Sequence, residues 1–161
     1  MIVGGTETAK DDFALYSPFG AVRQAVAEIK KGAESVGRSI DDVDRVKPVP
    51  VTVTRNKRQA LQDAKPRLAQ YLAQQPHIER PTEVDPELAQ RIKSIISWPA
   101  TEQQIQDGAR LIPDELVDSL GCYGDQDVVA ERLAEYVTAG ISSPTVSNPS
   151  KDTIDFLVKD F

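Results

Sequence analysis

The sequence predicts an α/β fold with parallel strands, because helix, glycine stop, short strand and helix cap follow one another between Tyr123 and Ser150. Asp125 can accept hydrogen bonds from the free N–H groups of a first helical turn. Gly140 stands where a left-handed residue would end that helix. Ile141–Ser147 is short and partly β-branched, as expected of a strand. The order of these signals is typical of a chain that alternates helices with parallel strands.

The two helices of this stretch each have a predicted apolar face. Asp127 adds a charge that favours the first helix's dipole, and Ser150 can cap the second. Apolar residues recur at helical spacing in both helices. The first face comprises Val129, Leu133, Tyr136 and Val137, and the last comprises Ile154, Leu157, Val158 and Phe161.

The first half of the chain opens with a possible strand, Met1–Gly5, and then a strong helix start. A strand with nothing before it is either an edge strand or a sign that preceding segments are missing. Ser17 is the expected cap and Pro18 the expected first helical residue. Gly37 supplies the stop. The apolar positions of this helix are Val22, Val26, Ile29, Ala33 and Val36.

Val46–Thr54 is the clearest strand of the chain, because valines alternate with prolines and threonines. A strand buried on both faces would be almost continuously apolar, so the threonine face is expected to border a polar cavity or solvent. Pro48 and Pro50 would direct their missing N–H groups toward the same neighbour. The start of the strand is therefore expected to be unpaired on that side.

The segment from Asn56 to Leu120 is predicted to contain one helix after another, with a loop at Gln74–Val84 and no strand between them. Pro66 lies inside its first helix and predicts a kink or a break there. This much helix indicates an insertion into an α/β core, at about residues 76–120. The helices are expected at Asn56–Gln75, from Asp85 and Pro86 onward, from the Thr101–Gln104 capping box to about Ala109, and at Pro113–Leu120.

Composition narrows the function classes. A length of 161 residues fits a single domain, 1–161, and the formal net charge of −6 argues against a nucleic-acid platform or an anionic membrane surface. No apolar run approaches the roughly 20 residues that span a bilayer, and no signal peptide is evident. One cysteine and one histidine argue against a disulfide framework and a His/Cys metal site, so a cytoplasmic location is expected.

Three single residues could each have a functional role, and each also has a simpler structural explanation. His77 could act as a general base, but it lies in a polar loop with no carboxylate fixed beside it, as a surface histidine would. Cys122 precedes a helix start that could lower its thiol pKa, although a lone cysteine more often packs as a small hydrophobe. Trp98 could stack on a planar ligand, although core packing is the commoner fate.

Two further patterns could likewise be functional or purely structural. Gly4, Gly5 and Thr6 follow the first short strand and could present backbone N–H groups to a phosphate, although a plain turn explains them as well. The acidic pairs stand at turns or helix starts, where capping accounts for them without catalysis. These pairs are Asp11–Asp12, Asp41–Asp42 and Asp125/Asp127.

Three stretches in order along the chain resemble the luciferase-like monooxygenase superfamily. They are similar in particular to the branch that uses the deazaflavin coenzyme F-420, to which methylenetetrahydromethanopterin reductase belongs. The stretches are IKKGAESVGRSIDDVD (Ile29–Asp44), VPVTVTRNKRQALQDAKPRLAQYLA (Val49–Ala73) and IPDELVDSLGCYGDQDVVAERLAEYVTAGISSPTV (Ile112–Val146).

The resemblance implies a (β/α)₈ barrel, which takes about 250 residues. The chain offers about three strands, so it is expected to be a partial TIM-type barrel, the C-terminal half of the family domain. In the family, many residues that hold the flavin or deazaflavin come from the other half. No catalytic residue is therefore carried over to this chain. An unclosed piece of barrel would expose sheet edges and an apolar face.

Barrel anatomy nevertheless indicates which residues would face a cofactor, because ligands lie over the carboxyl ends of barrel strands. Arg55 could meet a phosphate or a substrate carboxylate through two parallel hydrogen bonds. The expected cofactor-facing residues are Gly4, Gly5, Thr6, Thr54, Arg55 and Asn148.

The leading functional hypothesis from the resemblance is part of an oxidoreductase that uses coenzyme F-420 or FMN. Such an enzyme would transfer a hydride to or from a small organic substrate, with the cofactor supplying the chemistry. The chain alone would be inactive, or would need a second chain or self-association to complete the barrel. The alternatives are a truncated relative that acts as a dimerisation or protein-interaction module, and an unrelated helical α/β domain without a cofactor.

Overall fold

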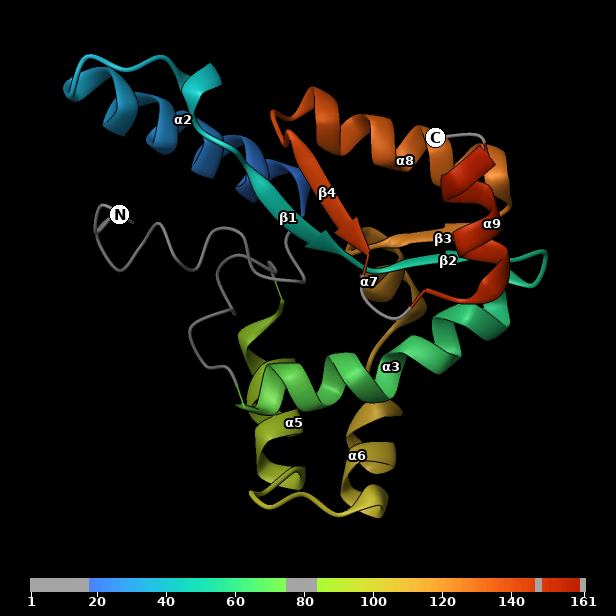
Figure 1. The fold of residues 1–161 in the computed structure, drawn as a ribbon. Coiled ribbons are helices and arrows are strands. Elements are labelled where there is room, and N and C mark those ends of the chain that lie inside the picture. The colour runs from blue at the N-terminus through green and yellow to red at the C-terminus, as the bar shows by residue number, and fades with distance from the viewer. Residues whose placement is uncertain (1–17, 75–83, 147–148, 160–161) are drawn as a thin grey trace.

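The computed structural model describes residues 18–74, 84–146 and 149–159, and shows strands and helices in the alternation expected of an α/β chain (Figure 1). The strands are β1 (Val46–Val49), β2 (Val51–Val53), β3 (Cys122–Gly124) and β4 (Ser143–Val146). The helices are α2 (Phe19–Ser35), α3 (Lys57–Gln74), α5 (Pro86–Ile95), α6 (Glu102–Ala109), α7 (Asp114–Ser119), α8 (Gln126–Thr138) and α9 (Lys151–Lys159), with a short 3₁₀ turn η1 (Ile40–Asp42).

The described strands pair in parallel, as the sequence predicted. The strand expected at Val46–Thr54 is present as β1 and β2, which Pro50 separates. β1 pairs with β4, with Val46 opposite Ser143, and β2 pairs with β3, with Val51 opposite Cys122. Proline has no N–H to donate to a neighbouring strand, and the strand changes its partner at Pro50.

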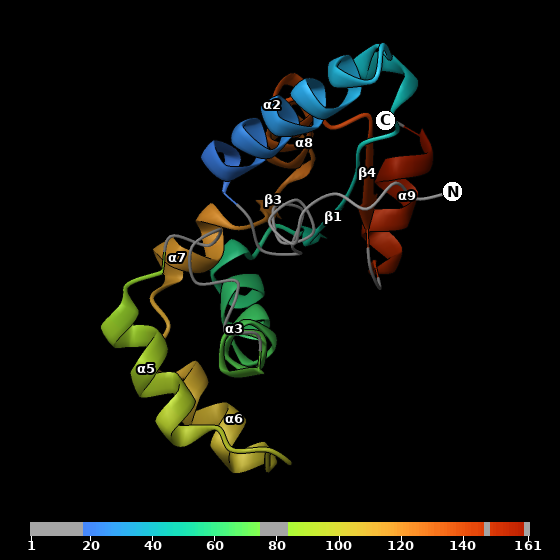
Figure 2. The same ribbon diagram turned by 90° about the vertical axis from the view of Figure 1, so that its left-hand side faces the viewer.

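Two apolar cores lie on either side of these strands. One joins Val49 of β1 and the valines of β2 to helices α2, α8 and α9, and contains Val22, Leu133 and Phe156. The other is formed by α3, α5, α6 and α7, with Tyr123 contributed by β3. Figures 1 and 2 show α5 and α6 extending away from the strands, below α3.

Four helix caps in the described part of the chain were predicted correctly. Asp85 accepts from the N–H of Glu87, Asp125 accepts from the N–H of Val128, and Thr101 forms the expected capping box. Ser150 accepts from the Thr153 N–H at the start of α9. Each cap depends on residues a few positions away, so the sequence contains the necessary information.

Gly140 ends α8 with φ of +104°, a conformation that side chains disfavour. Its N–H bonds the Val137 carbonyl and the next N–H bonds the Tyr136 carbonyl, which is a Schellman arrangement. A Cβ on Gly140 would also lie 2.7 Å from Val26 of α2. Conformation and space both require glycine here. Gly37, with φ of +72°, ends α2 through the same pattern of bonds.

Several expectations were wrong in detail. Pro18 is the N-cap of α2, not its first helical residue, and no side chain caps that helix. α3 continues through Pro66, so the predicted break is absent, while the predicted kink stays a prediction; buried leucines on both sides of Pro66 hold the helix against its neighbours. Val137 is 48 % exposed, so the apolar face of α8 is narrower than expected. Strand β3 was not anticipated, because three residues are too few to form a recognisable pattern.

The apolar face predicted for α9 was also wrong. The helix buries Thr153 and Phe156, while Ile154 and Val158 are 46 % and 80 % exposed. The reason is a hydrogen bond from the Val53 N–H of β2 to the Thr153 hydroxyl, 3.1 Å long, which turns the polar residue inward. The predictions for Met1–Gly5, Ser17, His77 and Phe161 concern residues outside the described ranges.

Candidate functional site

The carboxyl ends of β2 and β3 lie side by side. The Thr54 N–H donates to the Gly124 carbonyl oxygen at 2.6 Å, which extends the β2–β3 ladder by one bond. Helix α3 begins three residues after Thr54, and α8 begins two residues after Gly124. Two loops and two helix starts therefore converge at the carboxyl ends of these strands, which is where ligands bind in parallel α/β folds.

Local hydrogen bonds fix the loop between β2 and α3. The Thr54 hydroxyl accepts from the Asn56 N–H at 3.0 Å, and the Asn56 side-chain oxygen accepts from the Gln59 N–H at 3.2 Å. These bonds satisfy two backbone donors at the start of α3. Arg55, between them, is exposed, so its guanidinium projects from a loop of defined geometry.

Gly124 allows the second loop to turn sharply from strand to helix. It has φ of +153°, and a Cβ there would lie 2.9 Å from the Val128 side chain. The next residue, Asp125, caps α8 through the Val128 N–H at 3.0 Å. The Asp125 carboxylate is thus used in capping, and Arg55 places a cationic side chain at this end of the strands.

The structure describes two of the six residues expected to face a cofactor. Thr54 is half-buried and Arg55 is exposed, both at the expected end of the strand. Gly4, Gly5, Thr6 and Asn148 lie outside the described residues, and their role stays a prediction. Sequence reasoning missed Gly124 as a neighbour of Thr54. The signal was the Gly–Asp pair before a helix, but the three-residue strand in front of it went unrecognised.

A second polar group lies buried among the core side chains of β1, β3 and α8. Lys47 of β1, Cys122 of β3 and Tyr136 of α8 are all 0 % exposed. The Lys47 ammonium lies 5.5 Å from the centre of the Tyr136 ring and donates to the Pro48 carbonyl at 3.2 Å. The Tyr136 hydroxyl has no hydrogen-bond partner within the described ranges.

Burial shifts the pKa of each of these three groups in the direction that favours the neutral form of the side chain. Desolvation lowers the pKa of Lys47 to about 8, partly opposed by the neighbouring Cys122. Desolvation raises the pKa of the Cys122 thiol to about 12 and the pKa of the Tyr136 hydroxyl further above its usual value. Cys122 is therefore the small buried hydrophobe that the sequence favoured, not an activated thiol.

Sequence comparison decides the family. The model of the family described as luciferase-like monooxygenase matches residues 12–143, which is most of the chain. The chain belongs to the luciferase-like monooxygenase family.

Two relatives of this luciferase-like chain are reductases from Methanopyrus kandleri. Its sequence is 24 % identical over 127 residues to 5,10-methylenetetrahydromethanopterin reductase, covering 78 % of this chain and 35 % of the relative. Its fold matches the solved structure of the coenzyme F420-dependent tetrahydromethanopterin reductase with a TM-score of 0.75 and 18 % identity. That match covers 94 % of this chain and 46 % of the reductase chain.

The structural match confirms the predicted fold class, an α/β chain that corresponds to part of a TIM-type barrel. The luciferase-like chain spans about a third of the curated relative and under half of the solved one. At 18 % sequence identity, the structural match is evidence for the fold alone. The described residues contain no cluster of acidic, histidine or cysteine side chains that could hold a metal ion, and no helix long and apolar enough to cross a membrane.

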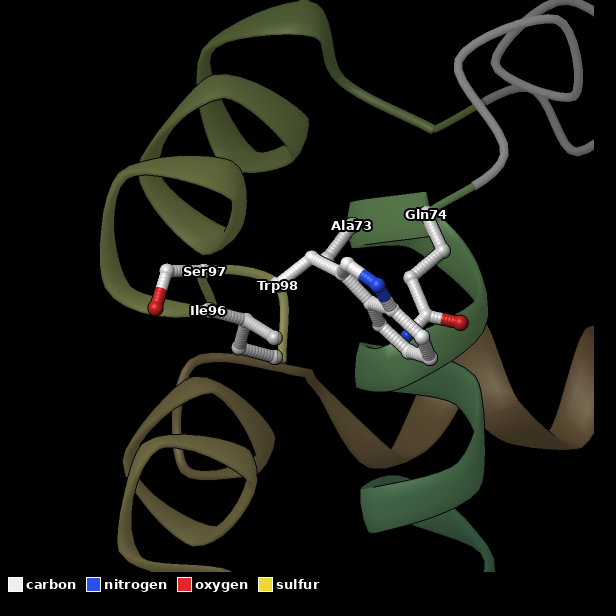
Figure 3. A pocket seen from close by; sticks show the side chains of 5 residues that line it. All are labelled: Ala73, Gln74, Ile96, Ser97 and Trp98. Carbon is white, nitrogen blue, oxygen red and sulfur yellow. The ribbon is translucent and has the colours of Figure 1, made fainter. Parts of the chain in front are cut away.

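A surface hollow of about 440 Å³ lies in the helical region, lined by residues of α3 and of the segment after α5 (Figure 3). Trp98 forms one side and is 77 % exposed, so the expectation that it packs in the core was wrong. Figure 3 shows its indole beside the Gln74 side chain. Ile96 forms the floor and is 5 % exposed. This hollow is lined by neither Thr54 nor Arg55.

Proposed function

We propose that this luciferase-like chain forms part of an oxidoreductase that binds coenzyme F-420 or FMN over the carboxyl ends of its strands. The bound cofactor would supply hydride transfer to or from a small organic substrate. The family match over residues 12–143 carries this proposal. The reductase names of the two relatives support the F-420 branch.

The described residues fit the anionic part of such a cofactor. Both cofactors carry a phosphate group, and Arg55 offers an exposed guanidinium at the carboxyl end of β2. A guanidinium can bind two phosphate oxygens through parallel hydrogen bonds. Thr54 and Asn56 hold the backbone around Arg55 through their own side-chain bonds. In this proposal Arg55 binds the anion, and the loop that carries it is fixed beforehand.

The proposal includes a complementary half of the barrel, on the same polypeptide or on another chain. The matched part corresponds to 46 % of the reductase chain, so a barrel needs further strands. Self-association or a second chain could provide them, and without them we expect no turnover. The partner classes proposed are thus a small-molecule substrate and a barrel-completing segment, with no nucleic acid or membrane.

Cofactor titration tests the proposal. F-420 and FMN are added separately to the purified chain, and cofactor fluorescence and melting temperature are followed. A ligand of the native state at about 100 times its Kd stabilises by about 2.7 kcal/mol, which is readily measured. Arg55→Ala should weaken cofactor binding roughly tenfold through loss of a charge-assisted hydrogen bond. The control is Arg67→Ala, at an exposed arginine on α3, which should leave cofactor binding unchanged.

The opposite result favours the second candidate function. If neither cofactor changes fluorescence or melting temperature at about 1 mM, a Kd below that level is excluded. The chain would then be a non-enzymatic interaction module. The observation in favour of this alternative is the outward-facing apolar pair Ile154 and Val158 on α9.

A further inference from the structure

The carboxyl end of β2 is held on both edges of the strand. Neighbouring residues of a strand direct their backbone groups to opposite edges. The Thr54 N–H donates to the Gly124 carbonyl oxygen on the β3 edge, at 2.6 Å. The Val53 N–H donates on the other edge to the Thr153 hydroxyl of α9, at 3.1 Å, and Figure 1 shows α9 beside the end of β2. Arg55 follows directly after these two residues of the strand end.

Thr153 belongs to a short chain of hydrogen bonds between α9 and β2. The residue is 0 % exposed. Its hydroxyl lies 2.9 Å from the Ser150 hydroxyl, and its backbone N–H donates to the Ser150 hydroxyl oxygen at 3.2 Å. A hydroxyl has one donor and two acceptor positions, so that of Thr153 can accept from Val53 and bond Ser150 at the same time. The first turn of α9 and the end of β2 are therefore joined through one buried side chain.

The orientation of α9 keeps this hydrogen bond and leaves apolar side chains in solvent. The helix buries Thr153 and Phe156, while Ile154 and Val158 are 46 % and 80 % exposed. A rotation of α9 by about 100°, one residue step of a helix, would bring Ile154 to the place of Thr153. Positions where packing departs from the local sequence pattern are expected at functional sites. The buried threonine of α9 is such a position, and it lies at the ligand-binding end of the strands.

The place of the strand end decides where the Arg55 guanidinium lies. Two parallel hydrogen bonds to a phosphate require a defined orientation of the guanidinium, so a small displacement of its loop weakens binding. The Thr54 and Asn56 side chains fix the loop that carries Arg55. They fix it relative to β2, so the loop moves with the strand end. Without the Thr153 hydroxyl the Val53 N–H would be buried without this acceptor, and the strand end would shift to find another.

From these contacts we infer that Thr153 is a positioning residue of the cofactor site. Its hydroxyl acts through Val53 and holds the carboxyl end of β2 in the place from which Arg55 reaches the anion. The inference rests on the proposed function, in which Arg55 binds the phosphate group of the cofactor. Thr153 is buried and does not touch the ligand, so its effect on binding passes through the strand end alone.

Cofactor titration of Thr153 variants tests this role, with circular dichroism showing that each variant is folded at the assay temperature. Thr153→Val keeps the shape of the side chain but removes the acceptor for Val53, so it should raise the Kd for F-420 or FMN roughly tenfold. Thr153→Ser keeps the hydroxyl and should restore the Kd to within about twofold of the wild-type value. Thr138→Val, at an exposed threonine of α8, is the matched control and should leave the Kd unchanged. A folded Thr153→Val variant that binds as the wild type does would overturn the inference.

A double-mutant cycle shows whether Thr153 acts through Arg55. In the Arg55→Ala background, Thr153→Val should leave the Kd unchanged, because the group that it positions is gone. Equal losses of binding in the two backgrounds would mean that Thr153 acts independently of Arg55, and would also overturn the inference.

Two further outcomes are decided by the same titrations. If Thr153→Val does not fold, Ser150→Ala takes its place in the cycle, since it removes the hydroxyl that bonds Thr153. That variant should raise the Kd about threefold in the wild-type background and leave it unchanged in the Arg55→Ala background; any other pattern refutes the role. If the wild-type chain binds neither cofactor, the proposed function fails and the inference falls with it. If the wild-type chain binds and the Thr153 variants bind equally well, the inference alone fails.

Discussion

Replacing Lys47 with methionine should stabilise the protein near neutral pH. The Lys47 ammonium is completely buried, and desolvation lowers its pKa from 10.5 to about 8. Below pH 8 the folded protein therefore bears the cost of a buried charge. Methionine has a similar length and flexibility without that charge.

The magnitude follows from the pKa. A difference between 10.5 and about 8 corresponds, at about 1.4 kcal/mol per pH unit, to about 3 kcal/mol. The contacts of the ammonium with the Tyr136 ring and the Pro48 carbonyl stabilise the same charged form and reduce the gain from its removal. We expect Lys47→Met to gain about 2–3 kcal/mol in free energy of unfolding at pH 7.

The pH dependence of the free energy of unfolding shows the direction of the Lys47 effect. Between pH 8 and 10.5 the unfolded chain holds a proton on Lys47 that the folded chain has released. The wild-type free energy of unfolding should therefore rise with pH in this range by up to about 1.4 kcal/mol per pH unit relative to the variant. The advantage of Lys47→Met is complete below pH 8 and disappears as pH approaches 10.5.

Urea unfolding followed by circular dichroism at several pH values between 7 and 10 measures this difference. Lys30→Met, at an exposed lysine of α2 paired with Glu34, should change stability little and without this pH dependence. If Lys47→Met is less stable than wild type at pH 7, or if the two unfolding curves shift in parallel with pH, the ammonium is not destabilising and the reasoning fails.

Three further predictions test the caps and the buried thiol. Gly140→Ala should cost about 2 kcal/mol or more, because φ is +104° and the new Cβ would meet a neighbouring side chain at 2.7 Å. Gly32→Ala, in the last turn of α2 with open space around it, should instead raise the free energy of unfolding by about 0.5–1 kcal/mol, and thermal unfolding separates the two variants. Asp125→Ala should lower the free energy of unfolding by about 1 kcal/mol through loss of the α8 cap. Asp127→Ala should lower it by only about 0.3 kcal/mol, because Asp127 interacts only with the helix dipole. Equal losses in the two variants would contradict the capping role of Asp125. Cys122, with its pKa raised to about 12, should resist alkylation at pH 8 until the chain unfolds; rapid labelling of the folded chain would show that the thiol is accessible.

Local features could be predicted from the sequence because their energetics involve few neighbours. The caps at Asp85, Thr101 and Asp125 each involve bonds within three residues of the helix start. The valine alternation likewise located the strand that carries Thr54 and Arg55 at its carboxyl end. The family pattern then supplied the barrel, and the structural match confirmed it.

Features that depend on a distant partner could not be predicted in the same way. The buried face of α9 is set by a hydrogen bond between Thr153 and Val53, which are 100 residues apart. Strand alternation places Lys47 on the same face as Val49 and Val51, but only the packing of α8 over β1 decides that the lysine itself is completely buried. The expectation for Trp98 failed for a related reason, since the helical region leaves its indole on the surface.

The sequence by itself determined the helices, the caps of α5, α6, α8 and α9, the strands β1, β2 and β4, and the family, because periodicity and capping are local and the family pattern is linear. Only the tertiary structure decided which strands pair, which face of α9 is buried, and that Gly124 lies against Thr54. Those features require two segments to meet, and the free energy of meeting depends on both surfaces at once.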